Sequence, residues 1–286
     1  MNFAYPMQKI QDWITQQWVI LWGRKIIPED YQWLMGPFGN LNSINEDFIN
    51  QFAEKENLVI DTKPKGLIFS INQLNISDNE LPRLSEKVID FYENTADYDL
   101  SFSIQWNSFF KVFGILINKL FSHRINQLNV PTHNIQNPVF INSEIITLRD
   151  PVTHETKYTF WLRSIKTNGQ SLYSGAYGIC TLPSGITCIK AVFPLPNGNA
   201  TVIMVPKIGI NGELILDSSG KNFGDAGFYF LLKDSKGAYW SQYIRSFRDQ
   251  LIISAENKQI IAIQTLTLWY QKVLKFNYKI LLKKVN

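Results

Sequence analysis

Several ionisable side chains lie in or beside apolar, strand-like segments in the second half of the sequence: Arg163, Lys190, Asp217, Asp225, Arg245, Arg248 and Asp249. A charge on a largely apolar face needs a partner or an opening to water. Lys190 is the clearest case, because its face also holds Cys180, Cys188 and Val192. We expect its ammonium group to reach water from a strand edge; the alternative is that it faces a pocket.

Other reactive residue types form no recognisable site. The three histidines, His123, His133 and His154, lie far apart and are not near Cys, Asp or Glu at ligand spacing, so we predict no metal site. Cys180 and Cys188 have no nearby histidine in the sequence that would activate a thiolate. A catalytic cysteine is therefore not indicated.

One glycine-rich segment, Gly220–Gly227, could suggest phosphate binding. It lacks the Gly-Lys-Ser/Thr ending of a P-loop and leads into Phe228-Tyr229-Phe230, which is strand-like rather than helical. We interpret it as a loop between two strands. No cofactor is predicted.

The segments around these residues read as a series of hairpins from about Phe140 to Ile280. Val, Ile, Tyr, Phe and Thr are frequent in them, and turn signals separate them: Pro183-Ser184-Gly185, Asn197-Gly198, Asn211-Gly212 and Glu256-Asn257. About eight to ten strands are expected, enough for a large antiparallel sheet or a partly closed barrel. The last segment, 266–282, could be helical, but its Thr, Trp and Tyr content favours strand.

A three-residue loop at 183–185 would place Cys180 opposite Cys188, and we expect two reduced thiols there. The same register groups one set of residues on a tyrosine face: Tyr173, Tyr177, Ile179, Ala191, Phe193, Val202 and Met204. The opposite face carries small residues and Lys190: Ser174, Ala176, Gly178, Cys180, Cys188, Lys190, Val192, Ile203 and Val205. Both faces are largely apolar, so the small-residue face must meet a helix, a second layer or a ligand.

The first 135 residues are expected to be mainly helical and to cover a β domain spanning 136–286, as one cooperative unit of the α+β class. Helices are predicted at Gln8–Ile26, from Ser43 to about Glu56, at Pro82–Glu93 and at Trp106–Leu128, with a small hairpin formed by Leu58–Ile60 and Leu67–Ile71. In the first helix, Ile10, Ile14, Trp18 and Trp22 form an apolar stripe. We expect this stripe to pack on the body of the protein; the alternative is an interfacial membrane helix bordered by Arg24 and Lys25.

Composition limits the function classes. Of 286 residues, 45% are hydrophobic and 18% charged, with 8 Trp, 12 Tyr and 19 Phe. The net charge of +4 comes without a dense Lys/Arg stripe, so nucleic-acid binding is not expected. The longest apolar stretch, Phe109–Phe121, is short and contains lysines, and Met1–Pro6 does not resemble a signal peptide. We expect a soluble, cytoplasmic protein without a transmembrane segment.

Aromatic richness and two apolar sheet faces favour a binding protein for a hydrophobic small molecule or lipid. The candidate ligand-binding residues are Ser174, Ala176, Tyr177, Gly178, Lys190 and Val192. An enzyme of the cyclase or isomerase type is the first alternative, with Asp217, Asp225, Tyr177 or Lys190 as acid or base. A structural or partner-binding protein, whose apolar face another chain covers, is the second.

Overall fold

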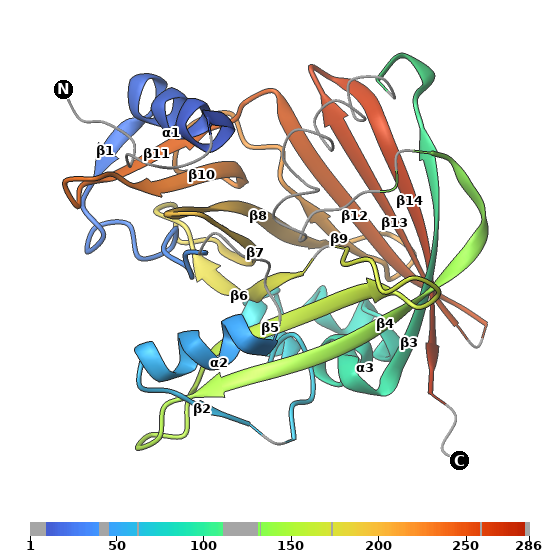
Figure 1. Cartoon of the computed structure of the whole chain (residues 1–286). Coiled ribbons are helices and arrows are strands. Elements are labelled where there is room, and N and C mark those ends of the chain that lie inside the picture. Colours follow the sequence, from blue (N-terminus) through green and yellow to red (C-terminus); the bar gives the residue numbers. More distant parts are fainter. Residues whose placement is uncertain are drawn as a thin grey trace.

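Ten antiparallel strands close into a barrel in the computed structural model, which describes residues 10–39, 46–61, 63–110, 131, 133–172, 174–257 and 259–283 (Figure 1). Around the barrel the strands run in the order β8-β7-β6-β5-β4-β3-β14-β13-β12-β9, and β9 pairs back with β8. Their bounds are β3 Tyr98–Trp106, β4 Ile135–Arg149, β5 Thr156–Ile165, β6 Gly175–Thr181, β7 Thr187–Leu195, β8 Gly198–Ile208, β9 Leu214–Asp217, β12 Phe247–Glu256, β13 Gln259–Leu268 and β14 Gln271–Leu282. The predicted α+β class with an antiparallel barrel is confirmed.

Strand β8 divides its outer edge between two partners. Residues 198–203 pair with β10 (Gly227–Lys233), whereas residues 205–208 pair with β9. From β10 the sheet continues outside the barrel through β11 (Tyr239–Tyr243) to β1 (Arg24–Ile26). One strand therefore closes the barrel and also begins a short outer sheet.

The predicted register of β6, β7 and β8 is confirmed. Cys180 pairs directly with Cys188, and both are buried free thiols. Tyr177 packs inside the barrel on a core cluster that contains Ala191, Phe193, Val202 and Met204, whereas Tyr173 lies outside the described residues. The Asn197-Gly198 signal marks the turn between β7 and β8, but Gly198 already belongs to β8, because it pairs with Leu195. The two loop residues are Pro196 and Asn197, and Asn197, not Gly198, has positive φ (60°).

Two N-terminal elements cover the small-residue face outside the barrel. Helix α2 (Glu46–Lys55) packs Phe48 and Phe52 on a cluster that includes Phe160, Ala176 and Val192. The predicted helix is confirmed there, although Ser43 lies outside the described residues. The segment after β1 packs Trp33 and Leu34 on Cys180 and Cys188.

Other N-terminal predictions need correction. Tyr98–Trp106 is a barrel strand, so the barrel begins inside the portion that we expected to be mainly helical. The predicted hairpin is wrong: β2 (Val59–Ile60) pairs with β4, and its supposed partner runs into a 3-10 helix at Ile71–Leu74. The predicted helix from Trp106 lies outside the described residues from position 111 onward.

Helix α3 (Glu86–Glu93) lies at one end of the barrel, beside β3 and β4 in Figure 1. A 3-10 turn at Leu81–Arg83 precedes it, so the helix predicted from Pro82 is confirmed with a later start. Its Val88, Phe91 and Tyr92 are buried and belong to the interior core cluster. This helix and the segment before it therefore contribute to the barrel core.

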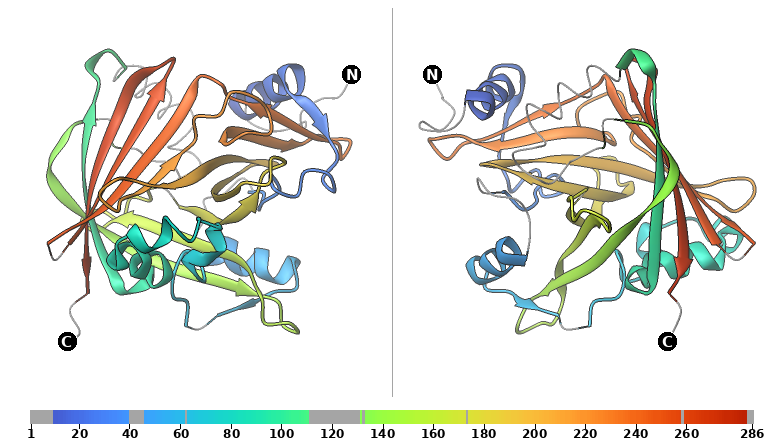
Figure 2. Two further views of the ribbon diagram at one scale, coloured as in Figure 1. Left: turned by 180° about the vertical axis from the view of Figure 1, so that it is seen from behind. Right: turned by 45° about the vertical axis from the view of Figure 1, so that its right-hand side comes forward.

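Helix α1 (Ile10–Trp22) lies over the outer sheet at the edge of the molecule (Figure 2). Val19 and Ile20 pack on Leu232, as expected for a helix on the protein body. In the predicted stripe, the Trp18 ring packs edge-on against Phe230 of β10, with ring centroids 5.9 Å apart. The prediction is wrong for Ile14 and Trp22, which are exposed. The final segment forms two strands, as favoured, joined by a turn at Trp269 and Tyr270.

We predict that the same substitution destabilises the protein at one glycine and has little effect at another. A Cβ on Gly198 would lie 2.1 Å from the Leu231 carbonyl oxygen of β10, whereas a Cβ on Gly178 would meet nothing within 4 Å. Gly198→Ala should therefore lower the free energy of unfolding by about 1–3 kcal/mol. Gly178→Ala, the matched control, should change it by less than ~0.5 kcal/mol. Denaturant melts measure both, and equal effects would contradict the close approach of β8 and β10.

Candidate functional site

The barrel interior holds a partly open cavity of about 330 Å³. Its wall is mostly apolar, with residues from eight barrel strands, from β10 and from the α3 region. Six polar side chains interrupt this wall: Tyr92, Arg163, Tyr177, Asp249, Gln264 and Tyr278. A largely apolar cavity with a few polar groups is the usual composition of a small-molecule site.

Arg163 brings a buried cation to the cavity. Its residue is 8% exposed, and β5 places it two positions after Trp161 on the inward-facing side. The guanidinium lies 4.1 Å from the Trp161 ring centroid, and Nη2 donates a hydrogen bond to the Tyr177 hydroxyl at 2.5 Å. Cation–π contact and this hydrogen bond hold the charge against the wall.

Tyr177 is the inward-facing partner of this cation on the adjacent strand β6. Its ring stacks edge-on with Trp161 and Phe193. Burial raises the pKa of the Tyr177 hydroxyl, and the charge of Arg163 opposes that rise. The phenol therefore stays neutral at neutral pH and offers one oxygen to the cavity.

Asp249 brings a buried carboxyl group to the cavity from β12. Its Oδ2 accepts a hydrogen bond from Gln264 Nε2 at 2.7 Å, and the Tyr278 hydroxyl donates to Gln264 Oε1 at 3.2 Å. Among the described residues, Oδ1 of Asp249 has no hydrogen-bond partner, although the residue is only 6% exposed. A buried acceptor in this state is costly unless something else bonds to it.

The pKa of Asp249 is raised to about 7. The main cause is burial, which penalises the carboxylate; the nearby charge of Asp217 adds to the rise, and the hydrogen bond from Gln264 opposes it. Near neutral pH the group is thus present in both forms. It can accept a hydrogen bond as a carboxylate or donate one as an acid.

Of the six predicted ligand-binding residues, only Tyr177 points into this cavity. Four others, Ala176, Gly178, Lys190 and Val192, line a second hollow of about 620 Å³ on the outer face, between the barrel and the N-terminal segments. The small-residue face is thus packed in part and open in part. Within this hollow, the absence of any atom within 4 Å of a Cβ built on Gly178 marks open space.

The expectation that Lys190 reaches water from a strand edge is wrong. Its Nζ donates to the main-chain oxygens of Trp33 at 3.1 Å and Met35 at 2.7 Å. Burial lowers its pKa. The ammonium group thus fastens the covering segment to β7, which is a structural role.

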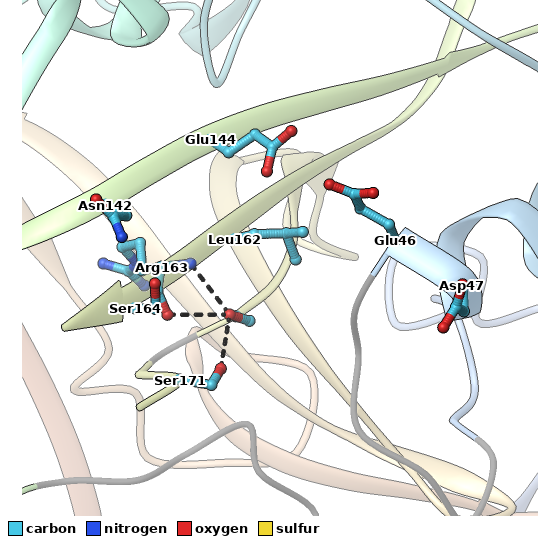
Figure 3. A pocket seen from close by; sticks show the side chains of 9 residues that line it. Glu46, Asp47, Asn142, Glu144, Leu162, Arg163, Ser164 and Ser171 are labelled. Atoms are coloured by element: carbon cyan, nitrogen blue, oxygen red, sulfur yellow. Dashed lines mark hydrogen bonds between the residues drawn. The ribbon is translucent and has the colours of Figure 1, made fainter. Parts of the chain in front are cut away.

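Ser174 lines neither the barrel cavity nor the second hollow. It lies at a third hollow of about 400 Å³ between the start of α2 and strands β4 and β5 (Figure 3). Its hydroxyl accepts from the Arg163 main-chain nitrogen at 3.1 Å and bonds to the Ser171 hydroxyl at 3.2 Å. Glu46 and Glu144 point toward each other across the opening (Figure 3). Burial and the charge of Glu46 raise the pKa of Glu144.

The remaining enzyme candidates have structural contacts. Asp217 Oδ1 accepts from the main-chain nitrogen of Ser219 at 2.9 Å, and Asp225 Oδ2 accepts from those of Lys221 and Asn222. Asp249 is one of the ionisable residues in apolar segments, but the sequence does not predict it as a site residue. Its alternation with Leu251 and Ile253, two and four positions on, was the signal that places it inside the barrel.

Comparison with known proteins adds one distant relative. Over 241 residues, 83% of this chain, the sequence is 24% identical to the uncharacterized membrane protein YndJ of Bacillus subtilis (strain 168). The match covers 41% of that protein, so the chain spans less than half of the relative's length. No family model and no solved structure matches. In the described part of the chain, no helix combines the length and apolar character needed to cross a membrane.

We predict a pH-dependent stability that depends on Asp249. Its pKa of about 7 in the folded protein lies above the ~3.9 of an unfolded aspartate, so the folded state holds this proton more tightly. The resulting stabilisation is complete below about pH 4 and is lost as the pH rises to about 7. Asp249→Asn should remove this slope, which is at most about 1.4 kcal/mol per pH unit.

Denaturant melts across this pH range measure the effect. Asp99→Asn is the control, because Asp99 is an exposed carboxylate on β3. It should keep the parent's slope. Equal slopes for the parent and Asp249→Asn would show that Asp249 is ionised normally in the folded protein.

Proposed function

We propose that this chain binds a hydrophobic small molecule or lipid inside the barrel. The observation that carries the proposal is the partly open cavity of about 330 Å³ with a mostly apolar wall. Protein interiors are normally packed with few voids, and a cavity of this size lies within the range of ligand pockets. A bound apolar molecule would regain the contacts that the empty wall lacks.

The polar groups suggest which end of the ligand would be recognised. Arg163 and Tyr177 lie on β5 and β6, while Asp249 and Gln264 lie on β12 and β13. Polar groups that are few and fixed set the orientation of an apolar ligand. We therefore favour a ligand with an apolar body and a hydrogen-bonding oxygen group over a pure hydrocarbon.

The distant relative supports the lipid variant of this proposal. YndJ is called a membrane protein, and this chain matches 41% of it. If this chain acts in a similar setting, membrane lipids are the most abundant hydrophobic molecules near it. Lipid is accordingly the first ligand class to test.

An enzyme of the cyclase or isomerase type is the second candidate, and Asp249 is the observation that favours it. A carboxyl group with a pKa of about 7 in an apolar cavity can take and return a proton at neutral pH. Asp249 replaces Asp217 and Asp225 as the candidate acid or base. The enzyme would be favoured if the parent protein converts a bound compound into a chemically different one and Asp249→Asn does not.

We predict that filling the cavity prevents uptake. Ala262 lines the cavity from β13, so Ala262→Phe should weaken binding of a bound lipid or an apolar dye by about tenfold, or ~1.4 kcal/mol. Thr265→Phe adds the same ring on the outward side of the same strand and should leave binding unchanged. Native mass spectrometry of the purified protein and dye titration measure both.

Two outcomes would contradict the proposal. One is a parent protein that carries no co-purified ligand and takes up no apolar dye. The other is equal binding by Ala262→Phe and the parent, provided that the melting temperature shows both to be folded. An equally strong loss of binding with Thr265→Phe would mean that the ligand binds outside the barrel interior.

A further inference from the structure

Helix α1 presents its apolar side to solvent. At about 100° per residue, positions 13, 14, 17, 18, 21 and 22 occupy one half of the helix surface. Four of these six residues are large, hydrophobic and exposed: Trp13 (42%), Ile14 (54%), Leu21 (74%) and Trp22 (73%). Trp18 is 37% exposed, and one side of its ring packs against Phe230. A surface helix normally faces the core with such a stripe.

The buried side of α1 is, by contrast, partly polar. Asp12 and Gln16 are 8% and 5% exposed, next to Val19 and Ile20. Gln16 Nε2 donates to the Pro196 oxygen at 3.1 Å, which ties the helix to the β7–β8 turn. Rotating the helix to bury its tryptophans would break this contact, so the observed orientation is fixed by specific bonds.

A second group of exposed aromatic residues lies at the β13–β14 turn. Trp269 and Tyr270 are 63% and 78% exposed, and both have positive φ, at 47° and 64°. Bulky residues seldom adopt this conformation, which glycine or asparagine would adopt with less strain. Phe109 is also 83% exposed. It lies two residues after Asn107, whose side chain donates a hydrogen bond to the main-chain oxygen of Lys272 beside this turn.

These two groups lie at the same end of the molecule. Figures 1 and 2 show α1 and the β13–β14 turn along one edge in all three views, with α3 on the opposite side. We call the exposed aromatic and aliphatic residues of α1 and of this turn the aromatic edge. Scattered single hydrophobic residues are ordinary on a surface, but a clustered set marks an interaction site.

The charges around the aromatic edge are positive. Residues 13–28 contain Arg24 and Lys25 and no carboxylate, and Lys272 follows the β13–β14 turn at the start of β14. Arg248 adds another cation, with its guanidinium 4.6 Å from the Tyr270 ring centroid. Trp and Tyr flanked by Lys and Arg match the interface of an anionic bilayer, where rings sit at the headgroups and cations meet lipid charge.

We infer that the aromatic edge docks on the surface of an anionic lipid bilayer, with α1 lying in the plane of the interface. The side chains of Trp13, Ile14, Leu21 and Trp22 enter the headgroup region, as in an amphipathic anchor helix. The cations nearby add an electrostatic attraction that salt weakens. This docking is independent of the ligand proposed for the barrel interior.

Binding to lipid vesicles tests the inference. The full chain is mixed with vesicles of phosphatidylcholine alone or of phosphatidylcholine with phosphatidylglycerol, and co-sedimentation and tryptophan emission are measured. We expect binding and a blue shift with the anionic vesicles, weakened by salt. An absence of vesicle binding overturns the inference.

Paired variants locate the surface. Leu21→Ser with Trp22→Ser should weaken vesicle binding by about tenfold or more, and Tyr270→Asn, which suits positive φ, should weaken it less. Ile210→Ser is the control. Ile210 is 88% exposed in the β8–β9 loop, where Arg83 donates to the Gly209 oxygen, away from the aromatic edge. An equal loss with Ile210→Ser overturns the inference.

Charge variants and oligomeric state complete the test. Lys272→Glu should weaken vesicle binding about fivefold or more, whereas Lys55→Glu on α2 should not. Light scattering of the parent without vesicles checks the other occupant of such a face. Self-association that Leu21→Ser with Trp22→Ser abolishes would mean that a second copy covers the aromatic edge, and would overturn the bilayer assignment.

Discussion

The divided edge of β8 is the constraint on which the rest of the structure depends. Its first half hydrogen-bonds β10 and its second half hydrogen-bonds β9, while β7 pairs along the other edge. The pairing with β9 closes the barrel and removes an edge that would otherwise stay open to other chains. The pairing with β10 directs the outer sheet away from the barrel and creates the platform on which α1 lies.

Closing the barrel means that the apolar residues on the two faces of β5–β8 are buried in two different ways. Inward-facing residues meet one another across the interior, and they leave a cavity beside Arg163 and Asp249. Outward-facing residues are also apolar, so they need a cover. Helix α2 and the Trp33 segment supply it, and Lys190 fastens the latter through main-chain oxygens. The N-terminal residues are thus a wrapping of the barrel more than a separate helical layer.

Local pairing could be predicted from the sequence, but long-range pairing could not. The turn at 183–185 and strict alternation were enough to place Cys180 opposite Cys188 and Tyr177 inside the barrel, because hairpin register follows from loop length. Strand β3 carries the same alternation at Leu100, Phe102 and Ile104, yet its partners β4 and β14 begin 29 and 165 residues after its last residue, Trp106. No local signal specifies such partners.

The orientation of α1 shows a related limit. A stripe of Ile and Trp at helical spacing is the same pattern whether it faces a core or a surface. The deciding facts were buried Gln16 and its bond to the Pro196 oxygen, a contact over 180 residues. For the candidate site, the residue types were visible in the sequence, since Arg163 and Asp249 stood out as charges among apolar neighbours. Their meeting at one cavity depends on barrel closure.

The barrel interior departs from a stable core in two ways at once. It leaves a void of about 330 Å³, and it buries a carboxyl oxygen that has no partner among the described residues. Each feature destabilises the folded protein, since empty volume loses contacts and an unbonded buried acceptor loses its hydration. A substitution of Asp249 by Leu or Met would remove the unbonded oxygen, so packing alone does not explain the observed residue. Local rules are broken together at one place, and the proposed binding role would give a physical reason for both departures.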